Sequence, residues 1–205
     1  MHHYRGQAAL ARATADALMA RAERTRNLQQ KAWSLRCLAL CGLYGGDLDE
    51  ATTHLETAVD ALSGSHDLNE VVPAWAALGL ARWRQGDRQR ALPLALRALD
   101  SSAGRPTGHS TLEGCSAIVE VLFASSEDPH SAEARHLMGR CLRILRHHQR
   151  VFPISRPRYL LWKGQRDWLL GKERSARARW REGLAAAEAL GMGLDVGLLR
   201  RKIDH

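Results

Sequence analysis

Two glycine–aspartate pairs, Gly46-Asp47 and Gly86-Asp87, each separate two apolar stretches whose hydrophobic residues recur at helical spacing. Glycine tolerates the positive φ that ends many helices, and aspartate accepts a backbone N–H at the start of the next helix. A small residue recurs along the chain at spacings of 40, 43 and 42 residues, at Ala51, Ala91, Ala134 and Ala176. Such a recurring unit predicts stacked helix pairs, because each pair buries its apolar face only against its neighbours.

Residues 73–99 show the pattern most clearly. Trp75 and Leu78 fall where the first helix faces its partner, and Gly79 and Ala91 are small where the two helices cross. Three further stretches carry the same pattern: 32–62, 157–184 and, more weakly, 111–148. The pattern resembles the tetratricopeptide repeat, whose unit has about 34 residues. The copies in this chain are longer, so we expect extended helices or extended connections.

The predicted fold is an all-α superhelix forming one domain over residues 1–205. A first helix is expected at 4–25 and a short closing helix at 194–203. Between them we expect four helix pairs, at about 28–63, 69–101, 110–149 and 156–190. The first helix has the pattern of the second member of a pair. We therefore expect a fragment of a longer protein, with an unpaired apolar face around Leu10 and Leu18.

The last repeat carries a more specific signal within residues 150–192. The residues concerned are Phe152, Pro153, Arg156, Pro157, Trp162, Gly164, Trp168, Gly171, Ala176, Trp180, Ala187, Leu190, Gly191 and Met192. This segment resembles the tetratricopeptide-like C-terminal region of bacterial signalling proteins in which a cyclase or kinase domain precedes an AAA-type (STAND) ATPase. Gly193 and Leu194 depart from that family, whose members usually continue with proline and tyrosine. The resemblance implies a sensor or scaffold arm in signal transduction.

Composition bounds the class of protein. Hydrophobic residues make up 45% of the 205 and charged residues 25%, which is typical of soluble globular chains. No apolar run reaches the roughly 18–20 residues that cross a bilayer. Gln7, Arg12 and Asp16 interrupt every apolar stretch near the N-terminus, so no signal peptide is expected and a cytoplasmic location is predicted.

The same sequence offers little chemistry. It contains neither a GxxxxGK[ST] phosphate loop nor a GxSxG nucleophile elbow. Asp47, Asp49 and Glu50 lie at a predicted helix start, where acidic side chains favour the helix dipole. The four cysteines fall inside apolar helical patterns and are interpreted as core residues, with a zinc site at Cys37 and Cys41 as the alternative. We expect no enzymatic activity, no cofactor and no metal.

A binding role is expected on the concave face, which the first helix of each pair lines in such repeats. The candidate groove residues are Trp33, Arg36, Leu40, Tyr44, Leu80, Trp83, Arg84, Arg158, Gln165 and Trp168. Aromatic side chains beside arginines suit a protein or peptide partner. The alternative for Trp33, Trp83 and Trp168 is burial in the core, where Trp75 and Trp180 are also expected.

The C-terminal part of the chain is basic. Residues 135–205 carry 17 Lys+Arg against 6 Asp+Glu, whereas residues 1–134 carry 13 against 16. Two stripes at helical spacing stand out: Arg143, Arg146 and Arg150, and Arg174, Arg177 and Arg181. They are either a solvated face or a surface for a polyanion. The favoured function is a non-catalytic interaction and regulatory scaffold that binds a peptide, protein or effector in the groove; polyanion binding and homo-oligomerisation are the alternatives.

Overall fold

The computed structural model describes residues 2–102 and 108–204, apart from the side chain of His109. Within these residues the chain forms ten α-helices and two short 3₁₀ turns and contains no strand. The helices are α1 (Ala8–Thr25), α2 (Leu28–Gly45), α3 (Leu48–Ala61), α4 (Leu68–Arg84), α5 (Arg88–Ser101), α6 (Leu112–Ala124), α7 (Ala132–Val151), α8 (Arg156–Leu169), α9 (Glu173–Ala189) and α10 (Gly193–Ile203). The all-α fold predicted from the repeat is confirmed.

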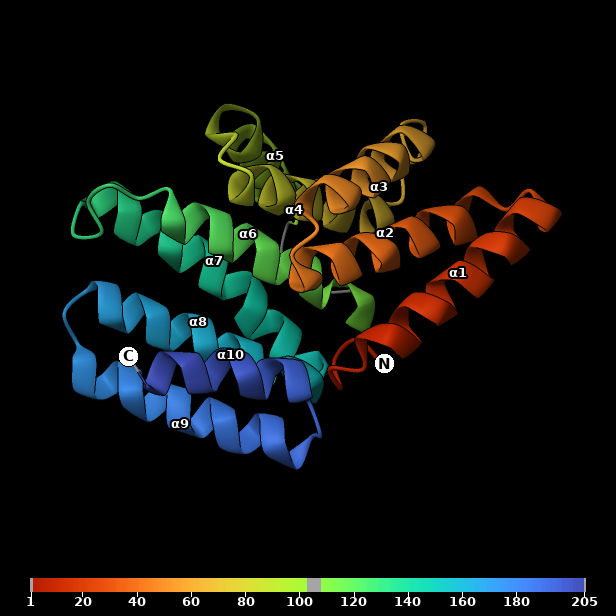
Figure 1. Cartoon of the computed structure of the whole chain (residues 1–205). Helices are drawn as coiled ribbons and strands as arrows, with labels where there is room; N and C mark the ends of the chain where they lie inside the picture. Colours follow the sequence, from red (N-terminus) through yellow and green to blue (C-terminus); the bar gives the residue numbers. More distant parts are fainter. Residues whose placement is uncertain (1, 103–107, 205) are drawn as a thin grey trace.

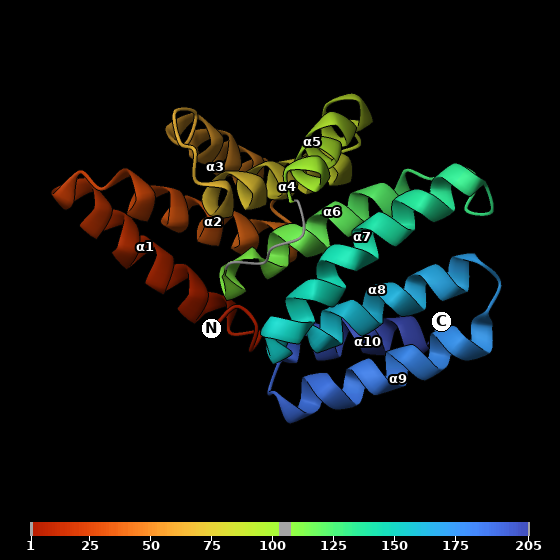
Figure 2. The same cartoon turned by 180° about the vertical axis from the view of Figure 1, so that it is seen from behind.

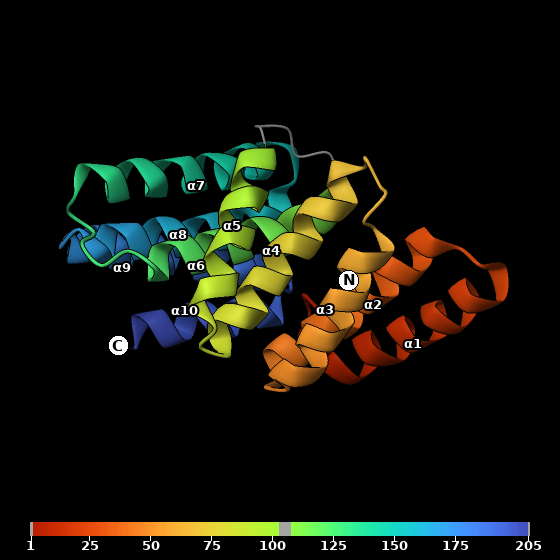
Figure 3. The same cartoon turned by 90° about the horizontal axis from the view of Figure 1, so that it is seen from above.

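The helices stack as a helical-repeat superhelix (Figure 1). Four antiparallel pairs, α2–α3, α4–α5, α6–α7 and α8–α9, lie between the single helices α1 and α10. The first helices of successive pairs pack on one another, as α4 does on α2 and on α6. The views from behind and from above show that the stack curves, so that α10 lies beside α8 and α9 and the N-terminal residues lie near its first turn (Figures 2 and 3).

The turns within the first two pairs form as the glycine–aspartate pattern predicts. Gly46 and Gly86 have φ values of 95° and 87°, in the left-handed region that glycine adopts without strain. The carboxylates of Asp47 and Asp87 accept backbone N–H groups from Glu50 and Arg90, at 2.9 and 3.1 Å. Each pair of residues therefore ends one helix and starts the next.

Removing the N-cap of α3 tests the role of Asp47 at this turn. We expect Asp47→Ala to lower the free energy of unfolding by about 1 kcal/mol, because the N–H of Glu50 loses its partner. Asp60→Ala is the matched control, since Asp60 is exposed near the C-terminal end of the same helix. Urea denaturation compares the two variants, and equal stabilities for them would contradict the capping role.

The four alanines that recur along the chain lie where helices cross. Ala51, Ala91 and Ala176 have no exposed surface, and Ala134 is also buried. A Cβ added at Gly79 would lie 3.2 Å from the carbonyl oxygen of Ala91, so the two backbones approach as closely as the sequence predicts. One apolar core extends from α2 to α7, and a second, around Trp180, joins α8, α9 and α10.

Two expectations need correction. The first helix begins at Ala8 and not at residue 4, because residues 2–6 form turns that end at Gly6, whose φ is 74°. The carbonyl oxygen of Tyr4 instead accepts the N–H of Leu194, at 3.2 Å, which joins the N-terminal segment to α10. Trp75 is only partly buried, and the guanidinium of Arg97 covers its ring at 3.7 Å.

In the part of the chain that the structure describes, no helix combines the length and the apolar character needed to cross a membrane.

Candidate functional site

The inner layer of the superhelix contains a pocket of about 490 Å³. Every residue that lines it belongs to an even-numbered helix, which is the first helix of a pair or, in α10, the helix that follows the last pair. Tyr44 comes from α2, Arg84 from α4, Phe123 from α6, Trp162 from α8 and Lys202 from α10. The pocket is therefore a product of the curvature, because it joins residues more than a hundred positions apart.

One wall of the pocket is apolar and rigid. Phe123 and Trp162 meet edge to face, with ring centroids 5.9 Å apart and planes at 75°. The indole N–H of Trp162 donates to the hydroxyl of Ser116 at 2.9 Å, which fixes the ring. Leu161 and Leu198 extend this surface from α8 and α10. An aromatic wall of this kind suits an apolar ligand group, because the side chains lose little freedom when they are covered.

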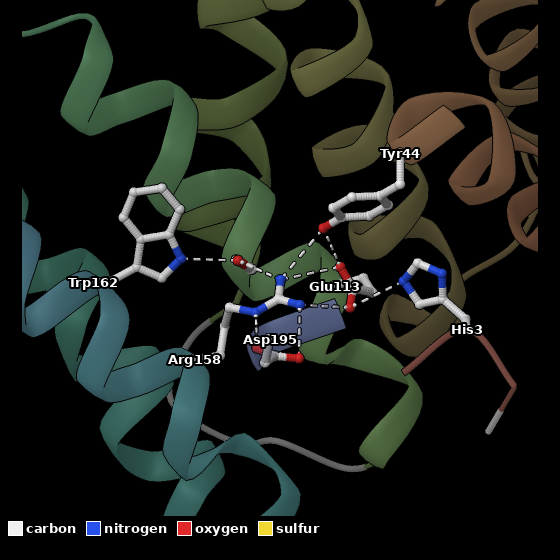
Figure 4. Close-up of polar contacts among 7 residues, drawn as sticks. His3, Tyr44, Glu113, Arg158, Trp162 and Asp195 are labelled. Atoms are coloured by element: carbon white, nitrogen blue, oxygen red, sulfur yellow. Dashed lines mark hydrogen bonds and ion pairs between the residues drawn. The ribbon is translucent and has the colours of Figure 1, made fainter. Parts of the chain in front are cut away.

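A buried ionic network connects the pocket residues Arg158 and Tyr44 to Glu113 and Asp195, which lie outside the lining (Figure 4). Arg158 is only 1% exposed, and its Nε donates to Oδ1 of Asp195 at 2.6 Å. Its Nη1 and Nη2 each lie 3.3 Å from one carboxylate oxygen of Glu113, and Nη1 also donates to Ser116 at 3.0 Å. The Tyr44 hydroxyl donates to Glu113 at 2.8 Å. One arginine of α8 thus ties α6 to α10, and through Glu113 also to α2.

The network has a clear electrostatic consequence for Glu113. Burial by itself raises the pKa of this carboxyl, but the charge of Arg158, the nearby imidazole of His3 and the hydrogen bond from Tyr44 outweigh it and lower the pKa to about 2. Burial, together with the nearby Glu113 carboxylate, raises the pKa of the Tyr44 hydroxyl well above its ordinary value. Glu113 is therefore ionised and Tyr44 neutral at neutral pH, and the network has a fixed charge pattern.

The N-terminal segment also contacts this network. His3 places Nε2 3.4 Å from a carboxylate oxygen of Glu113, and its ring lies 5.1 Å from that of Tyr44 (Figure 4). Burial raises the pKa of the Tyr4 hydroxyl well above its ordinary value. The segment before α1 thus packs into the centre of the superhelix, although the sequence predicted only a helix there.

Four of the ten predicted groove residues line the pocket: Tyr44, Arg84, Arg158 and Gln165. The guanidinium of Arg84 donates to Glu120 at 2.8 and 3.0 Å and to the carbonyl oxygen of Leu43 at 2.8 Å. Arg158 is held by Glu113 and Asp195, so its role in the pocket is structural.

The other six lie elsewhere. Trp33 is 37% exposed on α2, and Arg36 next to it pairs with Glu70 at 2.8 Å. Leu40 packs partly buried against the main core, whereas Leu80 is a core residue with 3% exposure and offers no surface to a partner.

Two of the tryptophans are engaged with neighbouring side chains. Arg88 covers the ring of Trp83 at 5.3 Å. Trp168 lies against the buried Trp180, with ring centroids 5.6 Å apart, and its other neighbour is the guanidinium of Arg177. Burial of Trp180 at 2% exposure confirms the core position expected for it.

Several pocket residues escaped the sequence analysis, among them Phe123, Glu120, Lys202 and Leu198. On α8 a signal was present, since Arg158, Trp162, Gln165 and Leu169 recur at four, three and four residues and share one helix face. On α10 the residues Leu198, Arg201 and Lys202 have the same kind of spacing, but the sequence pattern there predicts only a closing helix.

The two arginine stripes lie on α7 and α9, the second helices of their pairs. Five of their members are exposed and form no ion pair with the residues that the structure describes: Arg143, Arg146, Arg150, Arg174 and Arg181. Arg177 differs, because it is partly buried and donates to the carbonyl oxygen of Ile203 at 3.3 Å. The stripes lie on helices that do not contribute to the inner pocket.

The cysteines differ from the core interpretation at one position. Cys141 is buried and Cys41 and Cys115 are partly buried, but Cys37 is exposed, because it faces away from the packed side of α2. Among the residues described, no group of three His, Cys, Asp or Glu side chains is placed to hold a metal ion.

Comparison of the whole chain with known proteins returned no match, either to a family model or to a curated sequence. The pocket geometry and the sequence pattern therefore carry the functional argument.

Proposed function

We propose that this chain is a non-catalytic interaction module that binds a partner polypeptide on its inner face, at the pocket between α2, α4, α6, α8 and α10. The observation that carries the proposal is the make-up of the pocket. An apolar wall around Phe123 and Trp162 stands beside the cations Arg201 and Lys202. Interfaces use this combination, because buried aromatic anchors supply affinity and nearby charges supply orientation.

The rigidity of the site supports the same proposal. The buried pairs of Arg158 with Glu113 and Asp195 fix α6, α8 and α10 relative to one another, so a partner meets a preformed surface. Binding to a preformed surface costs less ordering entropy than binding to a loose one.

The wider role we propose is regulatory. The helical-repeat fold is compatible with a tetratricopeptide-like array, and residues 150–192 resemble the arm of cyclase- or kinase-linked bacterial ATPases. In such a setting a module of this kind supplies a docking or sensing surface to a catalytic domain. A protein scaffold role in signal transduction in the bacterial cytoplasm follows from the resemblance and is part of this proposal.

A blocking substitution tests the location of the site. Ala124 lines the pocket and is exposed at the end of α6, so Ala124→Arg fills the opening without disturbing the core. Peptides are first selected from a random display library on the wild-type protein and then measured by fluorescence polarisation. We expect Ala124→Arg to weaken their binding at least about tenfold, or about 1.4 kcal/mol.

The matched control is Ala189→Arg, which adds the same side chain at an exposed position on α9, outside the pocket. It should leave the affinity unchanged, and circular dichroism should show equal helicity in all three proteins. Peptides that bind Ala124→Arg as tightly as the wild type would place the site elsewhere. Failure to enrich any peptide over the bare matrix would contradict a polypeptide partner.

A further inference from the structure

The inner pocket has an uncompensated positive charge. Its lining includes four cations, Arg84, Arg158, Arg201 and Lys202, and a single carboxylate, that of Glu120. Arg84 pairs with Glu120, and Arg158 is neutralised by Glu113 and Asp195, which lie outside the lining. The two cations that α10 contributes to the lining, Arg201 and Lys202, therefore remain without a counter-charge within ion-pair distance among the described residues.

Lys202 is the more informative of these two cations. Its side chain is partly buried, and this loss of water lowers the pKa of its ammonium group. The Glu120 carboxylate acts in the opposite direction, but its Oε1 already accepts two hydrogen bonds from Arg84. An ammonium group that has lost water without gaining a partner is stabilised by an anion from outside the chain.

A second polar group in the pocket also lacks a partner. The Oε1 atom of Gln165 is buried and accepts no hydrogen bond from the residues that the structure describes. A buried acceptor without a donor costs about 1–3 kcal/mol. A ligand that carries an N–H or O–H group would remove this cost once the side chain turns its amide oxygen towards the pocket that it lines.

From these observations we infer that the pocket binds a small organic acid with an aromatic or other apolar body that carries a hydrogen-bond donor. The carboxylate would lie by Lys202 and Arg201, the body would cover Phe123 and Trp162, and the donor would face Gln165. The volume of about 490 Å³ falls within the range of roughly 300–1,000 Å³ that small-molecule sites occupy. The inference uses the pocket of the proposed function but goes beyond it, since it names a low-molecular-weight effector.

Three related probes separate the contributions that the charge and the N–H group of the ligand make to its affinity. Indole-3-acetate has the charge, the ring and the N–H; indole-3-acetamide lacks the charge; 1-naphthaleneacetate lacks the N–H. By isothermal titration calorimetry at pH 7 with the full chain, we expect the first to bind at least about tenfold more tightly than its amide. We expect it to bind severalfold more tightly than the naphthalene acid.

Variants assign these differences to residues. Lys202→Gln should remove the preference for the acid over the amide, and Arg201→Gln should reduce it. Gln165→Leu should remove the preference for indole over naphthalene. Arg200→Gln is the control, because Arg200 does not line the pocket and pairs with Glu188 at 3.0 Å. It should behave as the wild type does.

Equal affinity for the acid and the amide, or an acid preference that persists in Lys202→Gln and Arg201→Gln, would overturn the inference. So would the absence of binding by all three probes at millimolar concentration. Selected peptides that still require an open pocket at Ala124 would in that case leave the proposed function standing. If indole-3-acetate binds but no peptide can be selected, the small-molecule inference would stand and the proposed function would be contradicted.

Discussion

Replacing Arg158 by methionine is expected to lower the free energy of unfolding by about 3–5 kcal/mol at pH 7. The guanidinium is 1% exposed and is the shared partner of Glu113 and Asp195, which are themselves buried. Methionine fills much of the volume but leaves both carboxylates without a cation. Because domains of this size are stable by about 5–15 kcal/mol, the loss is a large part of the total.

The pH dependence of this variant gives a second, independent readout. In the wild type the pKa of Glu113 is lowered to about 2, below its unfolded value, so its contribution is complete above about pH 4.5. That contribution is lost as the pH falls towards 2. Without Arg158, burial dominates and raises the pKa of Glu113. The deficit of Arg158→Met should therefore be largest at neutral pH and shrink as the pH falls.

Arg156→Met provides the control for this measurement. Arg156 lies two residues away on α8, is exposed, and pairs with Glu182 at the surface. Surface pairs contribute about 0–1 kcal/mol, so this variant should unfold close to the wild type at every pH. Urea denaturation at pH 7 and pH 4 compares the three proteins. A cost for Arg158→Met below about 1 kcal/mol at pH 7 would contradict the role of the network.

Gly164→Ala is expected to destabilise the last repeat by about 1–3 kcal/mol. A Cβ at this position would lie 2.4 Å from Nε1 and 2.6 Å from Cδ1 of Trp180, and 3.1 Å from the carbonyl oxygen of Ala176. Trp180 cannot easily move, since it is 2% exposed and its indole N–H donates to the carbonyl oxygen of Leu161. The strain therefore exceeds the gain in helix propensity.

Gly139→Ala makes the same change in α7, where nothing lies within 4 Å of the added Cβ. There the lower entropy of the unfolded chain and the better helix propensity should raise the stability by about 0.5–1 kcal/mol. Thermal unfolding followed by circular dichroism should shift the two midpoints in opposite directions. Shifts of the same sign would show that the crossing at Gly164 is less tight than described.

The parts of the fold that depend on interactions between residues close in sequence could be predicted from the sequence. Asp47 and Asp87 cap helices, and Gly46 and Gly86 adopt positive φ, through atoms a few residues apart. The small residues at the crossings were likewise predictable, because a repeat imposes the same close approach on each copy. Both signals recur along the chain and reinforce one another.

The pocket could be predicted from the sequence only in part, because it depends on long-range packing. Its lining is selected by the curvature of the whole stack, which places Tyr44 of α2 and Lys202 of α10 around one pocket. Trp83 and Trp162 look alike in sequence, yet Arg88 covers one while the other forms the pocket wall. In the sequence Asp195 is an ordinary acidic residue in the first turn of a helix. No neighbouring residue in the sequence predicts its pairing with Arg158.

We expect a partner polypeptide to bind in the pocket of the inner layer. A titration followed by the indole N–H signals of the ¹⁵N-labelled protein tests it most directly, because the chain has 6 tryptophans and Trp162→Phe assigns the relevant signal. Addition of a selected peptide should shift the signal of Trp162 in a saturable way and leave that of the exposed Trp33 in place. A shift at Trp33 with an unchanged Trp162 signal would contradict binding in the pocket.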